Sequence, residues 1–166
     1  MRVLAQTIAT FFGAGLLKPA PGTWGSLAAL PAAWVLHSVG GFALLVAGTL
    51  IAFFAGWWAT SVATAGQDDH DPSEIVIDEV AGQWITLWAL SWPATQHGLD
   101  ITALWPGWIA AFLLFRLFDI TKWGPVGWAD RRGDALGVML DDVFAGVFAA
   151  IGVVLLAGLY HGVLGL

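Results

Sequence analysis

Charge-free apolar runs dominate the chain and predict helices that cross a membrane. The three longest runs cover residues 19–67, 80–99 and 143–166. A helix of about 20 apolar residues is long enough to span the hydrocarbon core of a bilayer. Each run reaches that length, so the pattern predicts an all-α, polytopic membrane protein built as a helical bundle.

The longest run is too long for one spanning helix and divides at Ser38–Gly41, where serine and glycine interrupt it. Residues 3–16 are apolar but short of a full span, so a short N-terminal helix is expected to lie at the interface, dip partway in or pack against the bundle. By length, the whole chain, 1–166, forms a single domain. Five spanning helices are predicted, at residues 24–39, 42–65, 78–97, 103–119 and 137–162.

Counting these crossings places the basic residues on one side of the membrane, with Arg2 among them if the N-terminal segment does not cross. That side also holds nearly all of the acidic residues. Because Lys and Arg mark cytoplasmic loops, the polar face is expected to be cytoplasmic. The basic residues are Arg2, Lys18, Arg116, Lys122, Arg131 and Arg132.

The composition narrows the possible functions. Hydrophobic residues make up 58% of the chain and charged residues 11%, whereas soluble domains carry about 25% charged residues. The net charge of −6 argues against a nucleic-acid partner. The absence of cysteine excludes disulfides, a thiolate nucleophile and cysteine-based metal sites.

Two pairs of adjacent acids stand where predicted spans enter the membrane. The pairs are Asp78 with Glu79 and Asp141 with Asp142. Gly82 follows Asp78 by four residues, and Gly146 follows Asp142 by four. Small residues on one helix face let neighbouring backbones approach closely in membranes. The two acidic entrances are therefore expected to touch.

The segment just before the first acidic pair carries a helix-start signal. Asp71 fits an N-cap, Pro72 the first helical position and Glu74 the third, a capping-box arrangement. The third predicted span is therefore expected to be extended toward its N-terminus by a helix that begins at Asp71.

Four acids brought together at a membrane surface would repel one another, so positive charge must lie between them. Arg116, Lys122 and the arginine pair are one source of that charge, and a divalent cation is another. With oxygen ligands and no cysteine, Mg²⁺ is the natural cation.

The stretch from Lys18 to Pro31 predicts a helix N-terminus. A glycine-containing loop that leads into a helix presents free backbone N–H groups, which suit phosphate, and Lys18 would add charge. The alternative is a plain N-cap supplied by Thr23 or Ser26.

The stretch FRLFDITK, residues 115–122, places Arg116, Asp119 and Lys122 three residues apart on one helix face. This face fits a salt-bridge network at the membrane surface. It fits a phosphate clamp with a metal ligand equally well.

Four motifs in this order resemble the phosphatidylglycerophosphatase A family: GTWGSLAALP (22–31), DPSEIVIDEVAGQW (71–84), FRLFDITK (115–122) and GVMLDDVFAG (137–146). The resemblance covers residues from about 15 to 150. It implies a small, helical, Mg²⁺-dependent enzyme of the bacterial inner membrane. Such an enzyme removes the terminal phosphate of phosphatidylglycerophosphate to give phosphatidylglycerol. The chain departs from the family pattern within residues 119–136, where Trp123 follows the lysine and GDALG precedes the last motif.

The resemblance also implies roles for individual residues. Glu79, Asp141 and Asp142 are expected at the centre of the metal site, with Asp78 as a further ligand. The same four acids and Asp119 are the expected catalytic residues. Phosphate is expected to bind Thr23, Ser26, Arg116 and Lys122, together with Lys18, which is added because of its charge just before the helix and not by the resemblance.

Two other functions fit parts of the pattern. A small cation- or proton-coupled transporter would use intramembrane carboxylates, but it predicts acids spread in depth and on both sides. A structural membrane subunit would use its acids to pair with a partner's cations. The expected partners of a lipid phosphatase are its lipid substrate and the bilayer. The many glycines and alanines on the spans also permit a homo-oligomer.

Overall fold

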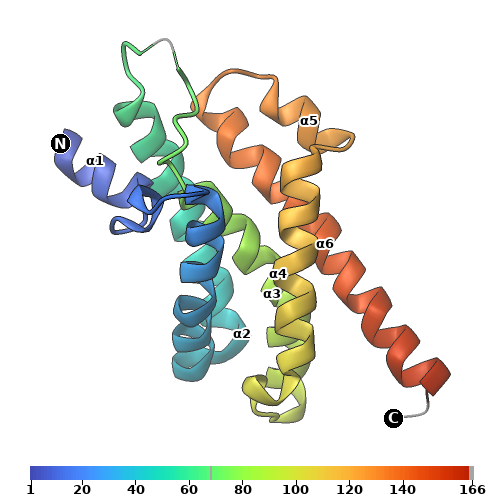
Figure 1. Cartoon of the computed structure of the whole chain (residues 1–166). Helices are drawn as coiled ribbons and strands as arrows, with labels where there is room; N and C mark the ends of the chain where they lie inside the picture. Colours follow the sequence, from blue (N-terminus) through green and yellow to red (C-terminus); the bar gives the residue numbers. More distant parts are fainter. Residues whose placement is uncertain (68, 165–166) are drawn as a thin grey trace.

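The computed structural model describes residues 1–67 and 69–164, which fold into a helical bundle without strands in this part of the chain (Figure 1). The predicted all-α class is confirmed. The elements are α1 (Arg2–Ala9), a 3-10 turn η1 (Ala14–Leu16), α2 (Pro21–Ala63), α3 (Ile77–His97), a second 3-10 turn η2 (Ile101–Leu104), α4 (Trp105–Thr121), α5 (Pro125–Asp130) and α6 (Ala135–Leu164).

Helix α2 is broken into two arms at Gly40 and Gly41, as the interruption of the apolar run predicted. Gly41 has φ +61°, a left-handed value that glycine adopts without a steric penalty. The Phe42 N–H donates to Thr95 Oγ1 at 3.0 Å. The first arm (residues 21–39) therefore runs down the bundle, and the second arm (residues 42–63) returns beside it (Figure 1).

In the described residues, three segments are long and apolar enough to cross a membrane. They are Pro21–Ala63, Ile101–Thr121 and Ala135–Gly162. Because α2 has two arms, these segments supply four apolar helical stretches. Helix α3 is the remaining long helix and is largely buried among the others. The count of five crossings stays a prediction, while the membrane-type bundle is confirmed.

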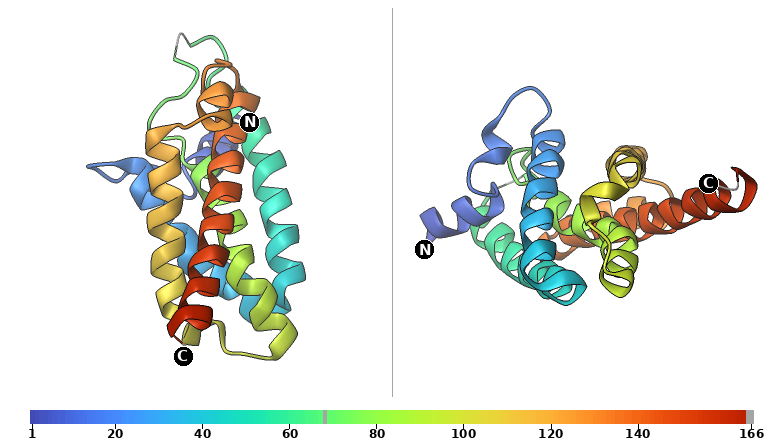
Figure 2. Two further views of the ribbon diagram at one scale, coloured as in Figure 1. Left: turned by 90° about the vertical axis from the view of Figure 1, so that its right-hand side faces the viewer. Right: turned by 90° about the horizontal axis from the view of Figure 1, so that it is seen from below.

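Helix α3 lies at the centre of the bundle. Figure 2, in its right panel, shows α3 with α2 on one side and α4 and α6 on the other. Most of its residues from Ile77 to Leu87 are buried. The N-terminal ends of α2, α3 and α6 lie at the same end of the bundle as the C-terminal end of α4 (Figure 1). This arrangement gathers the charged motifs at one end.

Helix α3 begins at Ile77, so the predicted helix start at Asp71 is wrong. Residues after Asp71 form a turn in which the Ile75 N–H donates to Pro72 O at 2.9 Å. The Val76 N–H then donates to Ala9 O at 2.9 Å, which ties the loop to the end of α1. A tertiary hydrogen bond thus replaces the local cap. Helix α1 packs against the bundle through Ala5 and Ala9, both fully buried.

Helices α3 and α6 meet at a pair of glycines. A Cβ atom on Gly146 would overlap the carbonyl oxygen of Gly82, and a Cβ atom on Gly82 would overlap the carbonyl oxygen of Asp142, so neither position has room for a side chain. The Thr86 hydroxyl lies 3.1 Å from Gly82 O and 3.2 Å from Gly146 O. The predicted contact between the two acidic helix entrances is confirmed, and it brings the carboxylates near these helix ends together.

Candidate active site

A polar pocket of about 220 Å³ lies at the charged end of the bundle. Four helices and the loop before α3 contribute to its walls. Its position matches the face on which the sequence concentrates charge. The pocket is lined by Ala20, Pro21, Gly22, Asp71, Ser73, Ile75, Asp78, Glu79, Arg116, Asp119, Ile120, Lys122, Asp141 and Asp142.

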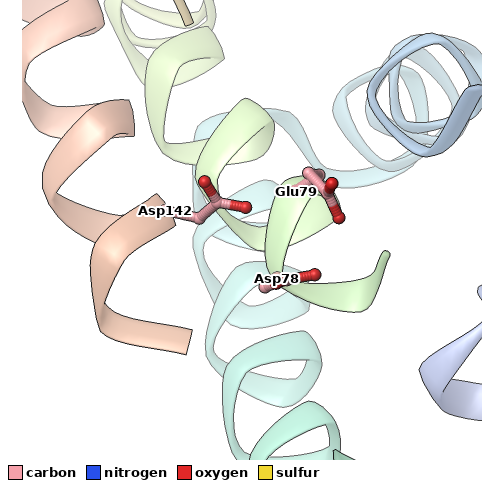
Figure 3. Close-up of side chains that lie close together, drawn as sticks. All are labelled: Asp78, Glu79 and Asp142. Carbon is pink, nitrogen blue, oxygen red and sulfur yellow. The ribbon is translucent and has the colours of Figure 1, made fainter. Parts of the chain in front are cut away.

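Three carboxylates converge in this pocket. Asp142 reaches from α6 toward Asp78 and Glu79 on the first turn of α3 (Figure 3). One oxygen from each of the three lies within 4.8 Å of the others. Asp78 and Asp142 are almost completely buried, at 6% and 2% exposed. Buried carboxylates at this separation need compensating positive charge to remain ionised.

The same three side chains carry oxygens that lack a hydrogen-bond partner within the described residues. These atoms are Asp78 Oδ1, Glu79 Oε2 and Asp142 Oδ1. Buried polar atoms without partners are rare in proteins, and a missing ion is one of the usual reasons. A set of carboxylate oxygens without sulfur or nitrogen donors is typical of Mg²⁺ or Ca²⁺. The residues therefore fit a hard divalent cation.

Asp141 borders the pocket but faces a different neighbour from Asp142. Its carboxylate pairs closely with Lys122 and also accepts the Asp142 N–H at 2.9 Å. Lys122 pairs with Asp130 at 2.9 Å as well. The structure thus brings together three of the four predicted metal ligands and gives Asp141 a cationic partner instead.

Lys122 is a fixed positive charge at the edge of the pocket. It lies just after α4 in the left-handed region, with φ +52°. Burial disfavours its ammonium group, but the carboxylates of Asp141 and Asp130 outweigh burial and raise the pKa of Lys122 above its usual range. Burial also raises the pKa of Asp71, a wall residue on the facing loop, although Lys122 opposes that shift. Lys122 therefore stays protonated.

Arg116 supplies the second positive charge, from the last turns of α4. Its Nη1 lies 2.5 Å from Asp119 Oδ2 and 3.8 Å from Glu79 Oε1. The same nitrogen lies 3.4 Å from Ser26 Oγ, and Ser26 donates in turn to Gly22 O at 2.9 Å. Asp119 and Ser26 thus fix the guanidinium beside the carboxylates. The salt-bridge network predicted for the Arg116 motif is thus present, and its role as a phosphate clamp stays a prediction.

The N-terminus of α2 forms another wall of the pocket. The helix begins at Pro21 and Ala20 is its N-cap, so the alternative of a cap by Thr23 or Ser26 is wrong. As a residue of the first turn, Gly22 has no intrahelical partner for its N–H. A Cβ atom on Gly22 would overlap Glu79 Oε1. Only a glycine lets α2 approach the carboxylates this closely.

The remaining predicted phosphate ligands lie outside the lining of the pocket. Lys18 is exposed, and Thr23 is half-buried on α2. Ser26 is fully buried and touches the site through Arg116. Their proposed contacts with phosphate stay predictions.

Two residues beside the site were not predicted from the sequence. Asp130, the last residue of α5, pairs with Lys122. Gln83 lies one turn below Glu79 on α3, is fully buried, and neither of its amide atoms has a partner among the described residues. A glutamine in a charge-free span one turn after an acid was the available signal. Buried amides of this kind commonly bind water or a polar ligand atom.

Comparison with known proteins adds a second line of argument. The family model described as phosphatidylglycerophosphatase A matches residues 7–157. The chain belongs to the phosphatidylglycerophosphatase A family. This membership confirms that the chain is an enzyme of the phosphatase class.

Relatives in three bacteria match most of the chain. Phosphatidylglycerophosphatase A of Haemophilus influenzae is 38% identical over 145 residues, covering 87% of this chain and 83% of the relative. Phosphatidylglycerophosphatase A of Escherichia coli is 37% identical and covers 86% and 77%. A putative phosphatidylinositol-3-phosphatase of Bacteroides thetaiotaomicron is 38% identical and covers 89% and 90%. No solved structure matches the chain.

Within this phosphatidylglycerophosphatase A family member, Gly22→Ala is expected to lower phosphatase turnover about tenfold or more while leaving thermal stability almost unchanged. The added methyl group overlaps the end of the flexible Glu79 side chain, so Glu79 moves and the helices do not. Turnover and thermal unfolding of the purified protein test this. Gly158→Ala, where a Cβ meets nothing within 4 Å, is the matched control. Equal turnover of the two variants contradicts the role of Gly22.

Proposed function

We propose that the chain is a Mg²⁺-dependent lipid phosphatase that hydrolyses the terminal phosphate of phosphatidylglycerophosphate to give phosphatidylglycerol, a step of phospholipid biosynthesis. The observation that carries this proposal is the cluster of Asp78, Glu79 and Asp142, whose three buried oxygens have no partner among the described residues and lie next to Arg116. Two relatives named for this activity cover most of the chain.

Asp78, Glu79 and Asp142 are the residues that would hold Mg²⁺. When bound, the ion would neutralise the cluster and the phosphate and act as a Lewis acid toward the phosphoryl oxygens. Without positive charge at this point, a phosphomonoester dianion could not approach three carboxylates. The ion therefore explains how an acidic pocket binds an anionic substrate.

The chain's own residues supply binding and orientation. Arg116, held by Asp119 and Ser26, points a charged donor into the pocket, and the Gly22 N–H offers a neutral donor at a helix N-terminus. Hydrolysis breaks the bond between phosphorus and the glycerol oxygen. The attacking water must lose a proton, and the departing glycerol oxygen must gain one. Asp71, Asp119 and Asp141 are the pocket carboxylates outside the metal cluster that are available for this transfer.

The position of the pocket suits a lipid substrate. It lies at the end of the bundle where the basic residues gather, which we assign to the cytoplasmic face of the bacterial inner membrane. A lipid headgroup can enter such a pocket while its acyl chains stay in the bilayer. The carboxylates gather at one end of the bundle, whereas a transport pathway would distribute them in depth.

Membrane vesicles test activity, metal and orientation together. Inside-out vesicles from cells producing the chain should release phosphate from a short-chain, water-soluble analogue of phosphatidylglycerophosphate, and EDTA should abolish the release until Mg²⁺ is restored. Intact right-side-out vesicles should release little. Vesicles carrying Asp142→Asn give the host background.

Different outcomes of the vesicle experiment would contradict the metal dependence, the orientation and the substrate of the proposal. Release that survives EDTA removes the metal dependence, and release by intact right-side-out vesicles in place of inside-out vesicles reverses the orientation. A preference for phosphatidylinositol 3-phosphate over phosphatidylglycerophosphate moves the substrate toward the activity named for the Bacteroides relative.

A further inference from the structure

A second cavity, of about 310 Å³, opens on the outer surface of the bundle toward the end opposite the polar pocket. Its exposed lining is apolar and comes from the first arm of α2, from η2 and from the start of α4. The residues are Leu30, Pro31, Trp34, Thr102, Trp105 and Trp108. Exposed side chains include Trp34 at 46% and Trp105 at 64%. We call this cavity the tryptophan groove.

The same two helices line the polar pocket at their other ends. Gly22 of α2 and Arg116 of α4 belong to that pocket. Between pocket and groove, the Arg116–Ser26 hydrogen bond joins the two helices. Helix α3 lies behind the line along which α2 and α4 meet. There Trp84 Nε1 donates to Ala29 O at 2.8 Å. The two cavities therefore lie along one line, the seam between α2 and α4.

The other helix pairs around the pocket are closed by tight packing. Gly82 and Gly146 bring α3 against α6, and Gly25 lies against Val76 at the junction of α2 with α3. Gly152 of α6 lies against Leu114 of α4. A lipid headgroup that enters the polar pocket from the bilayer is thus directed to the seam between α2 and α4. Ile120, which lines the pocket and is 67% exposed, lies at this edge.

The length of the seam matches the depth of one lipid leaflet. At 1.5 Å per residue, Leu30 lies about 12 Å along α2 from Gly22, and Trp108 lies about 12 Å along α4 from Arg116. Trp34 and Trp105 lie about 17 Å along the same helices. One leaflet contributes roughly 15 Å of hydrocarbon. An acyl chain whose headgroup lies in the polar pocket is therefore long enough to reach the tryptophan groove.

We propose that the tryptophan groove binds an acyl chain of the lipid substrate, with the chain lying along the seam between α2 and α4. This inference rests on the proposed function and adds a second binding subsite to it. The groove holds the substrate by its hydrocarbon while the polar pocket holds its phosphate. Binding energy from the acyl chain then positions a reacting group at the other end of the molecule.

The kinetic test compares two substrates with the same headgroup, dipalmitoyl phosphatidylglycerophosphate and its dibutyryl analogue. In detergent, the double variant Trp34→Ala/Trp105→Ala should lose about tenfold in kcat/KM toward the dipalmitoyl substrate, as expected when roughly two methylene groups lose their apolar contacts. Turnover of the dibutyryl substrate should not change. Trp57→Ala/Trp58→Ala removes two exposed tryptophans of the second arm and should leave both values unchanged. An unchanged ratio between the substrates in the groove variant overturns the proposal.

Photo-crosslinking tests the groove without requiring turnover. A palmitoyl substrate with a diazirine at the end of one acyl chain should label peptides covering residues 27–34 and 102–109 of the unsubstituted protein. Labelling spread evenly over the second arm and α6 overturns the groove and indicates ordinary annular lipid. If the unsubstituted protein hydrolyses neither substrate, the proposed function fails, and the crosslinking pattern still decides the groove.

Discussion

Asp142→Asn is expected to reduce phosphate release by about a thousandfold or more, the size of effect that follows when several kcal/mol of metal-based charge stabilisation is lost. Asparagine keeps the shape of the side chain but removes its charge. Asp142 contributes the one α6 oxygen to a cluster otherwise built from Asp78 and Glu79. Steady-state turnover of purified protein at saturating Mg²⁺ measures the change.

The same variant is also expected to change the melting temperature of the protein. In EDTA, Asp142→Asn should melt at a higher temperature than the unsubstituted protein, because it removes one of three buried like charges that have no ion between them. Asp100→Asn is the matched control, since Asp100 caps η2 at the opposite end of the bundle and asparagine caps equally well. A variant that keeps about a tenth of normal turnover shows that Asp142 is not a required ligand.

Gly146→Leu is expected to prevent stable folding of the bundle. Even a Cβ atom at this position overlaps the backbone of Gly82, so α3 and α6 must separate to admit a leucine. Overpacking commonly costs about 1–3 kcal/mol, and a backbone overlap in the central helix pair lies at or above the top of that range. The separation also moves Asp142 away from Asp78, which removes turnover from any protein that remains folded.

Size-exclusion chromatography and thermal unfolding in detergent measure this loss. Gly158→Leu makes the same change on the same helix where a Cβ meets nothing within 4 Å, so it should behave like the unsubstituted protein. If Gly146→Leu yields the same monodisperse peak and melting temperature as Gly158→Leu, the glycine contact does not hold the bundle together.

The sequence predicted the bundle well because its strongest signals are local. Long apolar runs mark helices, and the serine and glycine residues at 38–41 mark the break in α2. The spacing from each acid to its glycine predicted the meeting of α3 and α6. The start of α3 could not be predicted in this way, because Val76 bonds to Ala9 from a distant part of the chain.

The sequence predicted which residues gather at the candidate site but not which of them contact one another. Adjacent positions on a helix point about 100° apart, so Asp141 and Asp142 face different neighbours. The motif suggested one ligand set for both, whereas in the structure Asp142 joins the cluster and Asp141 pairs with Lys122. Which residue of such a pair faces which neighbour depends on the packing angle of two helices, and no local pattern encodes that angle.

The three carboxylates of the cluster come from only two helices, and this affects how the site responds to substrate exchange. Asp78, Glu79 and Asp142 all belong to α3 and α6, the pair locked together by glycines. The opposite wall, formed by α2 and α4, contributes backbone groups, the cationic Arg116 and its partner Asp119. In the proposed enzyme, lipid exchange along the seam between α2 and α4 would therefore leave the residues that would hold the ion undisturbed, and a bound cation would outlast many rounds of substrate exchange.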